Sequence, residues 1–181
     1  MPTNKPYFII EVANTHGGDF DYLLELIDAF KIYRKGFGMK FQVLHPDRIA
    51  TADFSYYNLY QKLRFDQDKW ELVISKAAKT KDVWLDIFDT YGVEVLIANI
   101  EKIHGIKFQS SVLYNYEVFN ALADTNLNKH KVILNVAAQP IDSIREIIGR
   151  VNKLLKPQEI LLEFGYQAYP TALEDSGYNK L

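Results

Sequence analysis

Short apolar segments and amphipathic segments alternate along this chain. Residues 7–12 (Tyr-Phe-Ile-Ile-Glu-Val) are rich in β-branched and aromatic side chains, which predicts a buried strand. After Gly17 and Gly18, apolar residues recur at helical spacing, which predicts an amphipathic helix starting near Asp19. The alternation then repeats. Further strands are predicted at residues 38–43, 83–88, 105–109, 131–136 and 159–164, and further helices at 67–80, 93–100, after Asn115 and along 141–155.

Repeated strand–helix units without hairpin signals are typical of a parallel sheet covered by helices. No Gly-x-Gly-x-x-Gly follows a predicted strand, which counts against a dinucleotide-binding fold. A complete barrel has eight such units in roughly 250 residues, whereas this chain has 181 residues. We therefore predict an α/β fold of the parallel (β/α) TIM-barrel type that is incomplete, with about six of eight βα units. We expect it to form one domain over residues 1–181.

One stretch, residues 44–65, has neither pattern and is expected to be irregular. It carries the aromatic residues Phe54, Tyr56, Tyr57, Tyr60 and Phe65. Aromatic side chains bury large areas, so packing in the loop or the core is the favoured interpretation. Stacking on a sugar ring is the alternative.

Composition excludes several function classes. The chain is 48% hydrophobic, which is enough for a core, and its 21 basic and 23 acidic residues are scattered. No basic stripe therefore indicates nucleic acid or an anionic membrane. The absence of cysteine rules out a disulfide framework and a thiolate site, and no segment has the length of a membrane span or a signal sequence. A cytoplasmic protein is expected.

Barrel enzymes place their chemistry at the carboxyl ends of the strands. That rule selects a set of polar candidates, namely Glu11, Lys40, Gln42, Asp86, Lys107, Ser110, Asn135 and the stretch 167–171. None of the four histidines has metal-ligand spacing, so no metal site is predicted within the chain.

Two predicted strands share a Lys-Phe-Gln pattern, at residues 40–42 and 107–109. In each, the first and third residues point to the same side of the sheet. A lysine inside an apolar strand is costly to bury without an anion. A phosphate or carboxylate ligand would supply that anion, and so would Glu11 or Asp86 through buried ion pairs. Both interpretations stay open at this stage.

Four segments, in order, resemble the signature of the N-acetylneuraminate (sialic acid) synthase family. Residues 11–19 (Glu-Val-Ala-Asn-Thr-His-Gly-Gly-Asp) resemble its opening E-I-G-x-N-H-x-G-D, and residues 40–42 match its K-F-Q. Residues 105–110 resemble its K-I-x-S segment, and residues 168–171 with Glu174 and Asp175 resemble its Y-P-T-P-x-E-D. Each lies at a predicted strand end. The resemblance implies the N-terminal barrel domain of such a synthase, truncated and divergent.

This family condenses phosphoenolpyruvate with an acylated amino sugar, such as N-acetylmannosamine, to a nonulosonic (sialic-type) acid and releases phosphate. Carbon 3 of phosphoenolpyruvate attacks the sugar aldehyde, which a divalent metal polarises, and water adds to carbon 2. By resemblance, the phosphoenolpyruvate anion is held by Lys40, Lys107 and Ser110. Glu11 would be the catalytic residue that stabilises the cationic centre or orients the sugar. The sugar would be contacted by Gln42, Gln167 and Tyr169.

The chain departs from the family pattern at two strand ends. Asp86 stands where the third strand usually carries Ser or Thr, and Asn135 stands in the usual S-T-G of the fifth. Both are candidate substrate-binding residues by position. A carboxylate beside a bound trianion raises the cost of binding unless a lysine neutralises it. The substrate is therefore expected to differ.

The family's metal-binding histidines lie on the seventh and eighth strands, and its C-terminal antifreeze-like domain reaches into the partner's site. We expect this chain to lack both. The ligands of the Mn²⁺ or Mg²⁺ would then lie outside it, and the fragment alone would be inactive. An open sixth strand is an association hazard, so a homo-oligomer or completion by another chain is expected. The alternatives are a non-catalytic binding or assembly module of surface-polysaccharide biosynthesis, or another phosphosugar-binding barrel.

Overall fold

Six parallel strands form one curved sheet, in the order in which they occur along the chain. The computed structural model describes residues 6–33, 36–137, 139–165, 172 and 174. The strands are β1 (Phe8–Ala13), β2 (Phe37–Val43), β3 (Asp82–Ile87), β4 (Ile103–Phe108), β5 (Lys131–Asn135) and β6 (Glu159–Glu163). All five neighbouring pairs are parallel. Each strand lies within two residues of its predicted bounds.

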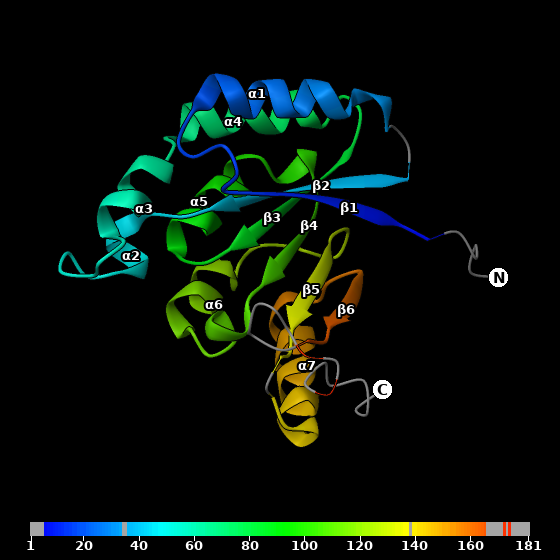
Figure 1. The fold of residues 1–181 in the computed structure, drawn as a ribbon. Helices are drawn as coiled ribbons and strands as arrows, with labels where there is room; N and C mark the ends of the chain where they lie inside the picture. The colour runs from blue at the N-terminus through cyan, green and yellow to red at the C-terminus, as the bar shows by residue number, and fades with distance from the viewer. Residues whose placement is uncertain (1–5, 34–35, 138, 166–171, 173, 175–181) are drawn as a thin grey trace.

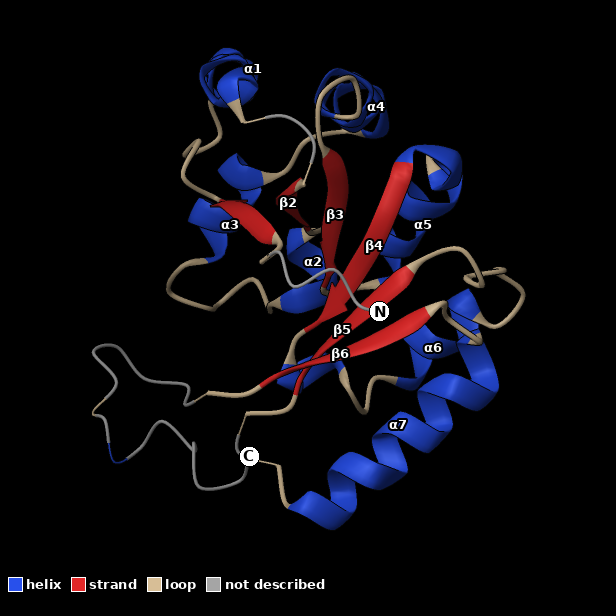
Figure 2. Cartoon of the chain, turned by 90° about the vertical axis from the view of Figure 1, so that its right-hand side faces the viewer, coloured by secondary structure: helices blue, strands red, loops and turns tan. Residues whose placement is uncertain are grey.

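Five helices cover the outer face of this sheet, as Figures 1 and 2 show. They are α1 (Phe20–Ala29), α4 (Gln67–Ala77), α5 (Thr90–Ala98), α6 (Tyr116–Leu122) and α7 (Ile141–Leu155). Short polar side chains begin four of them: Asp19, Asp66, Asp89 and Asn115 each accept a backbone N–H of the first turn. Single 3₁₀ turns lie at Phe30–Ile32, Ile100–Lys102 and Ser110–Val112. The prediction of an incomplete (β/α) barrel is confirmed.

The stretch 44–65 is more regular than its sequence indicates. It forms two short helices, α2 (Pro46–Ile49) and α3 (Tyr57–Leu63). Pro46 occupies the first turn of α2, where the fixed φ of proline favours a helix. Phe65 is buried against Phe20 and Trp70, whereas Phe54 and Tyr56 are exposed. Phe65 therefore packs in the core, and the ring of Phe54 packs within the loop against Tyr56 and Tyr60, as the favoured interpretation of loop or core packing predicts.

The two faces of the sheet are packed differently. Alternate residues such as Met39, Phe41 and Val43 are fully buried in the core beneath the helices. The concave face is filled at the amino end of the strands by Trp84, which is also fully buried. Its ring lies over Gly38 and Gly105, where an added Cβ would overlap the indole. This tryptophan closes the interior below the polar side chains.

The sheet is open on both sides within the described residues. There β1 pairs only with β2, and β6 pairs only with β5. In the described part of the chain, no helix is both long and apolar enough to cross a membrane.

Candidate functional site

Glu11 lies at a break in the β1 ladder. The register between β1 and β2 shifts between Glu11 and Ala13, and Ala13 has a φ of 48°, which is uncommon for a residue with a Cβ. The Glu11 carboxylate accepts the backbone N–H of Ala13 at 3.0 Å through Oε1, and its Oε2 pairs with Lys40. The bulge therefore fixes Glu11 on the concave face, toward β2.

Lys40 is buried on the concave face with two carboxylate partners. Its ammonium group contacts Glu11 and also donates to Oδ2 of Asp86 at 2.8 Å. Burial works to lower the pKa of Lys40, but Asp86 and then Glu11 outweigh it, and the pKa is raised. Lys40 is therefore held as a cation.

Asp86 is the most deeply buried charged group of the site, with a side chain that is 0% exposed. Its second oxygen, Oδ1, is buried and has no hydrogen-bond partner among the described residues. Burial raises the pKa of Asp86, against the attraction of Lys40 and Lys107. The carboxyl group has one strong partner where a buried carboxylate needs several.

Lys107 is buried one strand further along and has its own carboxylate partner. Its ammonium group lies 2.6 Å from Oε2 of Glu163, which comes from β6, two strands away. Glu163 is 42% exposed, since it lies on the open edge strand. The curvature of the sheet brings the two groups together across β5.

Both lysines face one cavity, as the sequence pattern predicts. The cavity has a volume of about 320 Å³ and is lined by Ile9, Glu11, Lys40, Lys107, Ile133, Leu161, Leu162 and Glu163. Its walls carry the ammonium groups of two lysines and the carboxylates of Glu11 and Glu163. A third carboxylate, that of Asp86, lies behind the wall and is ion-paired with Lys40. Both lysines have protein carboxylates as partners, so the ion-pair interpretation accounts for their burial.

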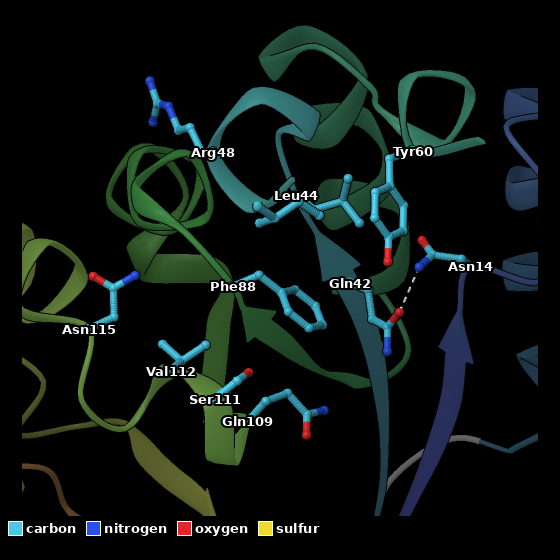
Figure 3. A pocket seen from close by; sticks show the side chains of 11 residues that line it. Asn14, Gln42, Leu44, Arg48, Tyr60, Phe88, Gln109, Ser111, Val112 and Asn115 are labelled. Carbon is cyan, nitrogen blue, oxygen red and sulfur yellow. Dashed lines mark hydrogen bonds between the residues drawn. The ribbon is translucent and has the colours of Figure 1, made fainter. Parts of the chain in front are cut away.

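A second, larger cavity lies beyond the first at the carboxyl ends of β2 to β4 (Figure 3). It has a volume of about 570 Å³, and its walls are rich in amide and hydroxyl groups. Asn14 donates to Oε1 of Gln42 at 2.7 Å. The lining residues are Asn14, Gln42, Leu44, Arg48, Ile49, Tyr60, Phe88, Gln109, Ser111, Val112 and Asn115.

The amide-rich cavity carries little charge. Arg48 is the one charged residue in its described lining, and its guanidinium is turned away from the other side chains in Figure 3. It donates to Thr90 at 2.7 Å and pairs with Glu94 at 2.8 Å. Uncharged donors and acceptors around Phe88 and Tyr60 suit a polar, uncharged ligand with one apolar face.

The remaining predicted residues are placed less centrally. Ser110 is half-buried in the turn after β4 and lines neither cavity, whereas its neighbour Ser111 lines the second. Asn135 is buried, donates to Gln109 at 3.2 Å and accepts the backbone N–H of Ala137 at 3.0 Å. Asn135 therefore contacts Gln109, which lines the second cavity. Gln167 and Tyr169 lie outside the described residues.

Sequence reasoning missed several residues of the two cavities. Glu163 is the most consequential, because it neutralises Lys107. It ends a strand and carries a polar side chain, so the rule that selects Glu11 and Asp86 also applies to it. Asn14, Arg48, Gln109 and Asn115 are further residues of the second cavity.

The described residues do not fit a divalent metal. No group of three or more His, Asp or Glu side chains among them is arranged to hold one. The three carboxylates of the first cavity are ion-paired with lysines instead. The described side chains alone therefore form no site for such an ion, and the expected Mn²⁺ or Mg²⁺, with ligands outside this chain, remains a prediction.

Three solved structures share this architecture. Spore coat polysaccharide biosynthesis protein E from Chromobacterium violaceum superposes with a TM-score of 0.78 and 21% identity over 95% of this chain and 52% of that chain. N-acetylneuraminic acid (sialic acid) synthetase from Leptospira borgpetersenii superposes with a TM-score of 0.78 and 22% identity, over 96% of this chain and 58% of that chain. Spore coat polysaccharide biosynthesis protein SpsE from Bacillus subtilis superposes with a TM-score of 0.70 and 19% identity, over 94% of this chain and 47% of that chain.

The chain has a sialic acid synthase-like fold. The resemblance carried by the four sequence segments is therefore confirmed at the level of the fold. No protein-family model matches the chain, and no curated protein matches it in sequence. The chain spans about half the length of the solved structures that it matches.

Proposed function

We propose that this synthase-like domain binds phosphoenolpyruvate on Lys40 and Lys107 and contributes that half of the site to a sugar-acid synthase. The observation that carries the proposal is the convergence of two buried ammonium groups, from β2 and β4, on one cavity at the carboxyl-terminal half of the sheet. Lysine ammonium groups in a confined site stabilise a phosphate or carboxylate and the negative charge that it develops. The likeness of fold to a sialic acid synthetase supports the same ligand class.

The second substrate would occupy the amide-rich cavity. An acylated amino sugar is uncharged, offers hydroxyl and amide groups and has an apolar ring face, which suits Gln42, Gln109 and Phe88. Gln42 lies two residues after Lys40 on the same side of β2, so the two ligands would be adjacent. Their condensation, with water, would give a nonulosonic acid and inorganic phosphate. Lys40 and Lys107 would position the donor, and Glu11 would face its cationic centre.

The open edges of the sheet bear on activity. Among the described residues, β1 and β6 each pair with one strand only, so each leaves one edge open to a further strand. We expect turnover only when additional strands complete the barrel, from a longer chain, another copy or another protein. A cysteine-free composition fits a reducing compartment, and we propose a cytoplasmic location.

Calorimetric titration with phosphoenolpyruvate tests the proposal. The unsubstituted chain should release or absorb heat at millimolar ligand, and Lys107→Ala should abolish it. Lys131→Ala is the matched control, since Lys131 begins β5 at the opposite end of the strands and is itself paired with Glu159 at 2.9 Å. An equal loss in both variants would contradict a site at Lys107.

One observation favours a second candidate, a non-catalytic binding or assembly module of surface-polysaccharide biosynthesis. The ammonium groups of Lys40 and Lys107 are already neutralised by Glu11, Asp86 and Glu163. A site that has lost its chemistry would keep such ion pairs for stability alone. The absence of any heat at millimolar phosphoenolpyruvate would favour this module. Binding of a sugar phosphate without phosphoenolpyruvate would instead indicate another phosphosugar-binding barrel.

A further inference from the structure

We propose that Asp86 sets the charge of the ligand that the lysine cavity accepts, so that a multiply charged anion binds only together with a proton taken up by Asp86. The inference rests on the proposed function, because it concerns the same cavity. It goes further by assigning a role in specificity to a residue at which this chain departs from its family.

Asp86 lies between the two lysines. In the sheet register, Asp86 pairs with Gln42 of β2 on one side and with Lys107 of β4 on the other. Its Oδ2 accepts from Lys40 at 2.8 Å, and its buried Oδ1 has no partner in the described part of the chain. An anion held by both ammonium groups would therefore lie close to this carboxyl group.

The charged groups around Asp86 do not favour a polyanion. Lys40 faces it from β2, Lys107 from β4 and Glu11 from β1, and Glu163 of β6 lies against Lys107. Three carboxylates against two ammonium groups leave the site with one net negative charge. A dianion would add to it at close range, where like charges repel strongly in a poorly solvated site. Neutralising one carboxylate removes the largest part of this repulsion.

Asp86 is the carboxyl group best placed to take the proton. Glu11 and Glu163 are 44% and 42% exposed, so each can turn toward water and relieve its repulsion. Asp86 is fully buried and has no such freedom, and its burial raises its pKa. When Asp86 takes a proton from water on Oδ1, its negative charge is neutralised, and the repulsion between Asp86 and the bound anion is removed.

Titration calorimetry with sulfate tests this proposal, because sulfate stays a dianion across the neutral pH range. For the unsubstituted chain, affinity should increase as the pH falls from about 8 to about 6. Heats measured in buffers of different ionisation enthalpy should report about one proton taken up per sulfate. Asp86→Asn should bind sulfate about tenfold or more tightly at pH 8, with no proton uptake. Lys40 keeps Glu11 as a partner in this variant.

Two further variants make the test decisive. Asp142→Asn makes the same change of charge at a side chain that is 89% exposed on α7, and it should behave like the unsubstituted chain. If Asp86→Asn does not fold, Glu163→Gln removes a carboxylate from the cavity wall and should also bind sulfate more tightly at pH 8. Sulfate binding without proton uptake, or no gain in affinity in either cavity variant, would overturn the proposal. Phosphoenolpyruvate that fails to bind while the sulfate results hold would refute the proposed function and leave the role of Asp86 intact.

Discussion

Replacing Lys40 by methionine should leave the carboxyl group of Asp86 buried without its ion-pair partner. Lys40 and Asp86 are 6% and 0% exposed, and Lys40 supplies the hydrogen bond to Oδ2 of Asp86. Methionine has a similar length but neither the charge nor the donor. Removal of one partner of a buried ion pair typically costs about 3 to 5 kcal/mol.

The structure gives an independent limit on this loss. Without Lys40, Asp86 avoids the cost of a buried, unpaired charge by taking a proton. The ordinary pKa of its carboxyl group is 3.8. Protonation at pH 7 then costs about 4 kcal/mol, at about 1.4 kcal/mol per pH unit. Part of this cost is already present, because burial raises the pKa of Asp86 in the unsubstituted chain. We therefore expect a loss of at most about 4 kcal/mol at pH 7, which becomes smaller by about 1.4 kcal/mol for each pH unit between pH 7 and pH 5.

Urea unfolding followed by circular dichroism at both pH values measures this difference. The double variant Lys40→Met with Asp86→Asn should recover most of the lost stability, because it has no unpaired carboxyl group in the interior. Lys76→Met is the matched control: Lys76 also lies 2.8 Å from a carboxylate, that of Asp28, but the pair is exposed and its loss should be small. A loss of stability in Lys40→Met no larger than in Lys76→Met, or equal at pH 5 and pH 7, would contradict the burial of an unpaired Asp86.

Two glycine substitutions and one histidine substitution test other parts of the account. Gly105→Ala should destabilise the fold strongly, because its Cβ would overlap Trp84 and lie 2.7 Å from the carbonyl oxygen of Lys131. In Gly149→Ala of α7 the added Cβ has no atom within contact distance, so this variant should be more stable by up to about 1 kcal/mol. Thermal unfolding compares the two variants. Burial lowers the pKa of His16, so the folded state binds fewer protons than the unfolded state, and stability should decrease as the pH falls through 6.5. His16→Asn keeps an acceptor for the N–H of Gly18 and should show a smaller decrease between about pH 7 and 5, and an equal decrease would contradict the assignment.

The sequence predicts the strands well because parallel strands buried on both faces are continuous apolar runs. It also predicts that Lys40 and Lys107 share a cavity. Each lysine lies two residues before a glutamine, so on each strand the two polar side chains lie on one face, and that face is the interior of the barrel. The inward position of Trp84 follows from the same rule, because Trp84 lies two residues before Asp86 on β3. The sequence does not show that its ring covers Gly38 and Gly105 of the two neighbouring strands, since that contact depends on the curvature of the sheet.

The partners of the lysines depend on the shape of the whole sheet. Pairing of Lys40 with Asp86 joins neighbouring strands and is among the expectations from sequence. Pairing of Lys107 with Glu163 spans β5, so it arises from the curvature of the sheet and not from any local pattern. The second cavity likewise combines the loop after β1 with the segments after β2, β3 and β4, which only the folded chain brings together.

Lysine-selective NMR during a titration with phosphoenolpyruvate tests most directly whether the two ammonium groups hold one ligand. Resonances assigned to Lys40 and Lys107, by their loss in Lys40→Met and Lys107→Met, should shift together and saturate at the same ligand concentration. Lys131, at the other end of the strands, should stay unchanged. Shifts confined to exposed lysines, or separate saturation of the two resonances, would contradict a shared anion site.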